Sequence, residues 1–123
     1  MVANSITVQN AADTGLNYTS QSAASGGDAF LNDGKTLVVF LNGNAGAVTL
    51  TITKQNKNPP AQGFNPITLT DTTVTIPGSG TNGGRCVVGP FGQTEYNDSS
   101  GLVQLSYSAV TSLTVSAVSI PRI

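Results

Sequence analysis

Six carboxylates and one thiol are the side chains of this chain best suited to acid–base or nucleophilic chemistry. The acids are Asp13, Asp28, Asp33, Asp71, Glu95 and Asp98. A glycosidase needs two opposed carboxylates, and Glu95 with one of the aspartates could supply them. Asp33 and Asp98, however, lie in Asn- and Gly-rich segments, where Asp commonly accepts hydrogen bonds from its own turn. We therefore interpret Asp33 and Asp98 as turn-stabilising residues.

The sequence contains no histidine, which removes the commonest general base and the commonest zinc ligand. The single cysteine, Cys86, follows Arg85, but a nucleophilic cysteine usually has a His partner or a helix N-terminus. We interpret Cys86 as a small buried strand residue. No acidic run resembles a calcium-binding loop, and the Gly-rich segment 78–85 lacks the Lys-Ser/Thr of a phosphate loop. The sequence predicts a protein that is not an enzyme and that binds no metal and no cofactor.

Charged residues are scarce, at 9% of the chain with a net charge of −1. This balance provides no basic surface for nucleic acid or anionic lipid, and no apolar stretch approaches the ~20 residues of a membrane span. The N-terminus lacks the basic region and the apolar core of a signal peptide, so we expect synthesis in a cytoplasm. Low charge also reduces repulsion between copies, which favours self-assembly.

The elements that must position these residues are strands, because apolar side chains recur at every second position. Segments of this kind, separated by turns rich in Asn, Gly or Pro, lie at 5–10, 35–42, 47–54, 66–71, 73–77, 85–91, 102–110 and 112–120. Such closely spaced short strands with no long helical pattern are typical of all-β proteins. The sequence predicts an antiparallel β-sandwich or a jelly-roll-like barrel of about eight short strands.

A chain of 123 residues most simply forms one domain. Residues 1–27 are expected to form an N-terminal strand and a flexible arm or loop, since residues 11–29 contain few large apolar groups beyond Leu16 and Tyr18. Residues 28–123 are expected to form the β-sandwich domain.

The strand at 35–42 contains a continuous apolar run from Leu37 to Leu41, so apolar side chains occupy both of its faces. A central strand of a sandwich normally meets water on its outer face, so this outer face requires a cover. One candidate is the Ser-, Ala- and Gly-rich segment from Asn17 to Phe30. The other is a neighbouring subunit or a host surface, because sizeable exposed apolar patches usually mark interaction sites.

Three segments carry a resemblance to a known family: NDGKTLVVFLN at 32–42, GPF and YND within 89–98, and YSAVTSLTVSAV at 107–118. With these segments the chain resembles a family of small all-β proteins encoded in tailed-bacteriophage genomes, several of which look like head decoration (cement) proteins. The resemblance covers roughly residues 28–120. The first 27 residues and the loop at 59–64 depart from the family pattern.

The resemblance implies a virion structural protein that binds the outer capsid surface and stabilises the contacts between capsomers. The implied partners are the major capsid protein and further copies of the chain, as a dimer or trimer, with neither nucleic acid nor membrane. The candidate capsid or subunit contacts are Val2, Ile6, Leu16, Tyr18, Val38, Phe40, Phe64, Phe91 and Tyr96. Two alternatives stay open: a phage tail or fibre component, and a carbohydrate-binding or adhesion module that would use Tyr96 or Tyr107. The absence of Trp, on which sugars commonly stack, weighs against the carbohydrate module.

Overall fold

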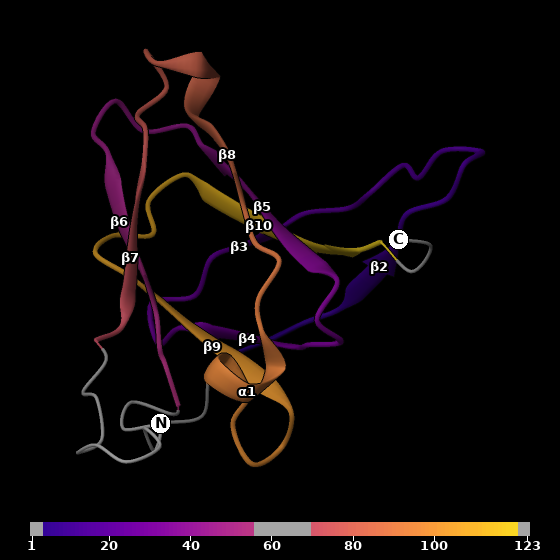
Figure 1. Cartoon of the computed structure of the whole chain (residues 1–123). Helices are drawn as coiled ribbons and strands as arrows, with labels where there is room; N and C mark the ends of the chain where they lie inside the picture. The colour runs from indigo at the N-terminus through magenta and orange to yellow at the C-terminus, as the bar shows by residue number, and fades with distance from the viewer. Residues whose placement is uncertain (1–3, 56–69, 121–123) are drawn as a thin grey trace.

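The alternation of side chains in the sequence becomes the alternation between a buried and an exposed face in the folded chain. In β6 (Val48–Ile52), Val48, Leu50 and Ile52 are buried while the intervening threonines lie toward solvent. A computed structural model of the chain describes residues 4–55 and 70–120, and these residues form two β-sheets packed face to face (Figure 1). The predicted all-β sandwich is confirmed, and no closed barrel forms within the described residues.

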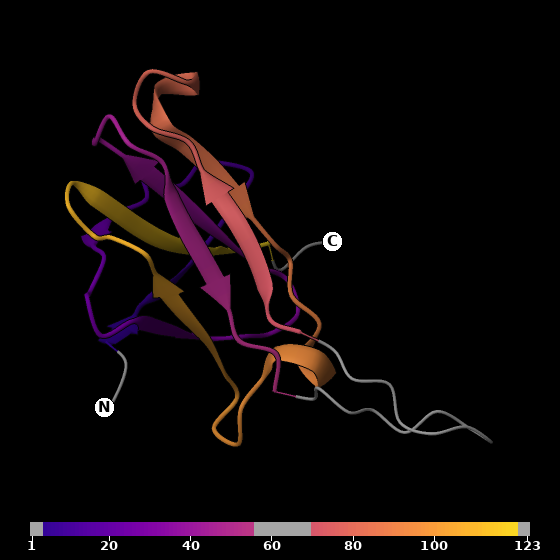
Figure 2. The same ribbon diagram turned by 90° about the vertical axis from the view of Figure 1, so that its left-hand side faces the viewer.

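Each of the two sheets has five strands. Sheet A has the order β1 (Asn4–Ile6), β4 (Asp28–Leu31), β9 (Leu102–Tyr107), β6 (Val48–Ile52) and β7 (Thr72–Ile76). Sheet B has the order β2 (Val8–Asn10), β10 (Leu113–Ser119), β5 (Thr36–Asn42) and β8 (Arg85–Val88), and β3 (Gln21–Ser22) also pairs with β10. Figure 2 views the molecule from the side on which β6 and β7 lie. The edge strands β7 and β8 are joined by the loop that contains the short 3₁₀ turn η1 (Asn82–Gly84).

The sheets are mixed rather than wholly antiparallel, because the N-terminal segment contributes one parallel pair to each of them. β1 runs parallel to β4 in sheet A, and β2 runs parallel to β10 in sheet B. The segment expected as one strand at 5–10 therefore changes sheets at Thr7. The short strands β1, β2 and β3 of the N-terminal segment therefore pair with strands of both sheets.

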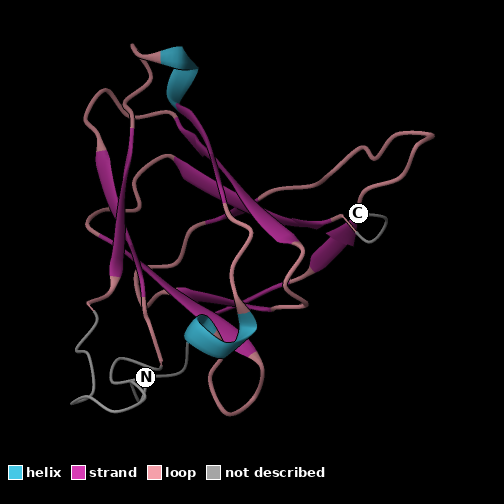
Figure 3. Ribbon diagram, viewed as in Figure 1, coloured by secondary structure: helices cyan, strands magenta, loops and turns pink. Residues whose placement is uncertain are grey.

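Two further expectations need adjustment. The strand expected at 85–91 ends at Val88, because Gly89 has a φ of 120° and Pro90 has no N–H to donate. A four-residue helix, α1 (Gln93–Tyr96), follows it, as Figure 3 shows. The strand expected at 66–71 lies almost entirely outside the described residues.

The core lies between the two sheets and is made of aliphatic and aromatic side chains. Its largest fully buried members are Phe30, Phe40, Leu50, Ile52, Ile76 and Leu113. Burying each side chain of this size contributes about 1.5–3 kcal/mol, so the apolar faces of the strands drive the packing of the sheets. Asn42 is also fully buried, and its amide donates to the carbonyls of Gly46 and Pro77, which ties two loops to the end of β5.

Candidate interaction surface

The acids that could have formed a reactive pair instead hold turns together. Asp33 accepts hydrogen bonds from the Lys35 N–H at 2.8 Å, the Thr36 hydroxyl at 2.9 Å and the Ser119 hydroxyl at 2.6 Å. The bond from Ser119 leads the interactions that lower the pKa of Asp33 below its ordinary value. Asp98 accepts from two backbone N–H groups and from an amide side chain, and its pKa is likewise lowered. The turn role expected for Asp33 and Asp98 is confirmed.

A third acid, Asp28, is fully buried and satisfied within the sandwich. It accepts hydrogen bonds from the Tyr107 hydroxyl at 2.7 Å, the Ala24 N–H at 3.2 Å and the Asn4 amide at 3.3 Å. Burial, followed by this contact with Asp28, raises the pKa of the Tyr107 phenol. The arrangement locks β1, β4 and β9 together.

Other polar and thiol groups of the described residues show no convergent chemistry. Glu95 pairs with Lys54 at 3.4 Å at the surface, and burial raises the pKa of the Cys86 thiol, which disfavours its reactive thiolate. Within residues 4–55 and 70–120, no three His, Cys, Asp or Glu side chains gather closely enough to hold a metal ion. The helices found in these residues are too short and too polar for a membrane span.

The structure separates the predicted contact residues into three groups. Ile6, Val38, Phe40 and Phe91 are buried in the core of the chain itself, so their prediction as contacts with a neighbour is corrected. They were chosen as apolar residues in strands or loops, and the sequence does not state which face of a strand turns inward. Val2 and Phe64 lie outside the described residues.

Leu16, Tyr18 and Tyr96 are the predicted contacts that retain exposed surface. Tyr96 is half-buried, because its ring packs edge-on against Phe91 and its hydroxyl hydrogen-bonds the Thr72 hydroxyl at 2.7 Å. Leu16 is also half-buried, whereas Tyr18 is 51% exposed. Tyr18 is therefore the predicted contact best placed to meet a partner.

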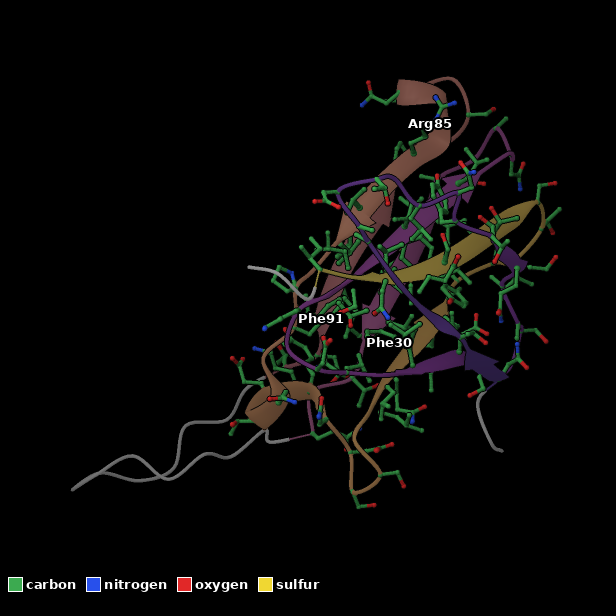
Figure 4. The ribbon with its side chains drawn as sticks, turned by 90° about the vertical axis from the view of Figure 1, so that its right-hand side faces the viewer. Phe30, Arg85 and Phe91 are labelled. Atoms are coloured by element: carbon green, nitrogen blue, oxygen red, sulfur yellow. The ribbon has the colours of Figure 1, made fainter. Side chains whose placement is uncertain are left out.

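The segment from residue 11 to residue 20, called the arm here, leaves sheet B after β2 and returns to it at β3. Its return is fixed by Gln9, whose amide donates to the Thr19 carbonyl and accepts from the Thr19 N–H, both at 2.8 Å. Figure 4 views this side of the molecule, with the arm passing in front of sheet B. Ser116 lies on the outer face of β10 and is nevertheless buried, which shows that this part of the face is covered. In β5 itself, Val39 is half-buried and Leu41 is 45% exposed, so the outer face of this strand is covered only in part.

A groove of about 240 Å³ remains between the arm and the β5–β8 edge of sheet B. It is lined by Tyr18, Ser20, Val39, Phe40, Leu41, Arg85, Cys86 and Val87. The described residues contain four large hydrophobic side chains that are exposed, and three of them line this groove: Tyr18 at 51%, Leu41 at 45% and Val87 at 61%. The fourth, Leu31, does not line the groove. Exposed apolar surface is thus concentrated on one feature, as is typical of an interaction site.

Two hydrogen bonds show which residues of β5 direct their main-chain N–H and C=O groups toward β10 and which direct them toward β8. Beyond one end of the strand, the Gly43 N–H donates to the Ser112 carbonyl at 2.8 Å. Beyond the other end, the Ile120 N–H donates to the Lys35 carbonyl at 3.0 Å. Odd-numbered residues therefore direct their main-chain groups toward β10. Because this direction alternates along an antiparallel strand, the even-numbered residues of β5 direct theirs toward β8.

The same alternation assigns the main-chain groups of β8. Its even-numbered residues pair with even-numbered residues of β5, as Cys86 lies opposite Phe40. Arg85 and Val87 consequently direct their main-chain groups away from the sheet. The Arg85 N–H donates to the Asn82 carbonyl. This leaves the Arg85 carbonyl and the N–H and carbonyl of Val87 on the free edge, without a hydrogen bond to any described residue.

Arg85 is the charged side chain of the groove, and it is exposed. Figure 4 shows it at the end of the sandwich opposite to Phe91, beside the turn that precedes β8. Among the residues that the structure describes, Lys54 and Glu95 form the single ion pair. The Arg85 guanidinium therefore has no carboxylate partner among them. The groove therefore combines apolar walls, a free main-chain edge and one positive charge.

Leu41, Arg85 and Val87 are residues of this surface that were absent from the predicted contacts. For Leu41 a signal existed, since it ends the two-sided apolar run of β5. Val87 lies in the short apolar run after Arg85, but its importance depends on β8 being an edge strand, which only the strand order reveals.

Comparisons of the chain with protein-family models, with curated proteins and with solved structures found no match.

Proposed function

We propose that this chain is a structural virion protein of a tailed bacteriophage, which binds the outer surface of the capsid as a decoration protein. Its partners would be the major capsid protein and further copies of the chain, in a dimer or trimer. The resemblance of residues 28–120 to phage-encoded decoration proteins supports the proposal. The proposal rests mainly on one observation: exposed apolar side chains are concentrated in the groove beside the free edge of β8. A surface of this kind suits binding rather than catalysis.

The physical mechanism is the burial of apolar surface together with main-chain hydrogen bonding. A stable protein interface buries roughly 800 Å² on each partner, and symmetric display on a capsid adds avidity between many copies. Few charges are available to be screened, so attachment is expected to depend weakly on salt. A decoration protein of this type would stabilise capsomer contacts without any reactive side chain.

A phage tail or fibre component is the alternative that uses the same surface, and the location of the protein in the virion distinguishes the two. A carbohydrate-binding module gains no support from the aromatic side chains. The hydroxyls of Tyr96 and Tyr107 bond to Thr72 and Asp28 within the chain, so these rings do not form an open platform. Tyr18 is the exposed tyrosine of the described residues, and it lies in an apolar groove.

The test mixes the purified protein with undecorated heads of the phage that encodes it and measures co-sedimentation at about 0.1 M and 0.5 M NaCl. We expect saturable binding that changes little with salt. Failure to co-sediment at either concentration would count decisively against decoration. Immunogold labelling of whole virions separates head from tail, and label confined to tails would transfer the assignment to a tail component.

A further inference from the structure

We infer that the free edge of β8 and the adjoining groove accept an extended segment of a partner protein, which adds to sheet B as a strand and carries an acidic residue that pairs with Arg85. This inference rests on the proposed binding function, but it does not require the partner to be the capsid. It specifies the surface, the backbone geometry and the charge of the bound segment.

The first argument is the geometry of the edge. The N–H and carbonyl of Val87 and the carbonyl of Arg85 point away from β5, where an added strand would pair with them. Strand addition at such an edge supplies affinity through main-chain hydrogen bonds. Natural edge strands often carry charge or proline to prevent this pairing; in β8 these lie at one end and just beyond the other, as Arg85 and Pro90, and the exposed side chain between them is the apolar Val87. The edge is short, because the chain turns at Gly84 and Pro90, so it fits a segment of about four paired residues.

The second argument is the side-chain environment beside the edge. In an added strand, the residue opposite Val87 would place its side chain on the outer face of sheet B, about 4.5–5.5 Å away between Cβ atoms. A side chain at that position would lie beside the apolar groove that Tyr18, Leu41 and Val87 line. An aliphatic or β-branched residue fits it best. Specificity in strand addition comes from such alternate side-chain positions.

The third argument is charge complementarity, and it selects the partner. Arg85 is exposed at the end of the groove and has no carboxylate partner in the described residues. Two copies of β8 paired antiparallel about a two-fold axis would bring two Arg85 side chains to the same short edge without an acid from either strand. In such a pair neither Arg85 would meet an acid, because β8 contains none. An acidic segment of a different protein therefore fits better than a second β8.

The test selects displayed random peptides of about ten residues on the wild-type protein, followed by affinity measurements on synthetic copies of the enriched sequences. We expect enriched peptides to carry Asp or Glu two residues from an aliphatic residue. Arg85→Glu should weaken these peptides by about tenfold or more, and a peptide with Lys in place of its acid should recover binding to that variant. Val87→Lys should weaken all of them by about tenfold.

A matched control is Thr75→Lys, which places the same charge on an exposed residue of the edge strand β7 in sheet A. It should leave peptide affinity within about twofold. Hydrogen exchange gives an independent readout, because peptide binding should slow exchange of the Val87 amide, which is free, but not of the Cys86 amide, which already faces β5. Thermal melts establish that each variant is folded.

Several results would overturn the inference: no enrichment over a bead-only selection, equal weakening by Thr75→Lys, or unchanged exchange at Val87. A dimer of the wild-type protein that Val87→Lys dissociates would also overturn it, since the occupant would then be a second copy. The proposed decoration function fails separately. If heads bind the protein but no peptide binds at the β8 edge, decoration survives and the edge inference fails. If peptides bind at the edge as expected but heads do not bind, the edge inference survives and decoration fails.

Discussion

Replacing Tyr107 with Phe removes the shortest of the three hydrogen bonds that the buried Asp28 carboxylate accepts. The Tyr107 hydroxyl lies 2.7 Å from Asp28 Oδ2, while the Ala24 N–H and the Asn4 amide lie 3.2 and 3.3 Å from the carboxylate oxygens. Asp28 is fully buried, so water is not positioned to replace the lost donor. The substitution therefore tests how much one donor contributes when its acceptor is a buried acid.

The expected loss is about 2 kcal/mol of unfolding free energy. A hydrogen bond to a charged group contributes about 1.5–3 kcal/mol, and leaving part of a buried acceptor without a donor adds to the cost. The ring of Tyr107 packs edge-on against Phe40, with the ring centroids 6.0 Å apart. The variant keeps this aromatic ring and loses only the hydroxyl, so the change in packing contributes little. Against a typical total of about 5–15 kcal/mol, this loss is readily measured.

Tyr96→Phe provides a matched control. Its hydroxyl also makes a 2.7 Å hydrogen bond, and its ring also packs edge-on against a phenylalanine, Phe91, at 5.4 Å. The acceptor or donor there is the neutral, half-buried Thr72 hydroxyl rather than a buried carboxylate. We expect a loss of about 1 kcal/mol or less.

The assay is equilibrium unfolding in urea, followed by circular dichroism, for wild type, Tyr107→Phe and Tyr96→Phe. Equal slopes of free energy against urea would confirm that the variants unfold from the same state. The reasoning is refuted if Tyr107→Phe loses no more than Tyr96→Phe, because the buried acid would then not distinguish the two hydroxyls.

Burial and the Asp28 carboxylate raise the pKa of Tyr107, so the stability contributed by its protonated phenol is present below the ordinary value of 10.0 and lost as the pH rises above it. The unfolding free energy of wild type should therefore fall more steeply than that of Tyr107→Phe above about pH 10, as measured by urea titrations. Gly84 has a φ of 74°, and a Cβ there would clash with the Asn42 carbonyl, so Gly84→Ala should lower the unfolding free energy by at least about 2 kcal/mol. Its control is Gly80→Ala, which has open space around it and should change the unfolding free energy by less than about 0.5 kcal/mol. Asn42→Ala removes the donor to two loop carbonyls and should cost about 2–4 kcal/mol in the same urea assay, and a loss below about 1 kcal/mol would contradict its assigned role.

The side-chain periodicity of the sequence was sufficient to predict the class of the fold. Alternation in β6 and β10 predicts strands with one buried face, and the structure buries those faces. The turn roles of Asp33 and Asp98 were also predictable, because most of their hydrogen bonds reach residues only a few positions along the chain. Such short-range hydrogen bonds can be predicted without knowing the order of the strands.

The residues that line the groove were not predictable in the same way. The apolar run of β5 showed that both faces of the strand are apolar, but not that Phe40 faces the core while Leu41 faces the groove. The parallel pairing of β1 and β2 and their change of sheet likewise leave no periodic trace in so short a segment.

From the sequence alone, this protein is a chain of short, half-buried strands with few reactive groups. Its tertiary structure decided that β8 is an edge strand and that Tyr18, Leu41, Arg85 and Val87 meet in one groove. The physical reason is that alternation records only whether a side chain is buried, whereas strand order is set by the competition among many non-local pairings. Those pairings share the same local pattern and differ only in the packing of the complete sandwich.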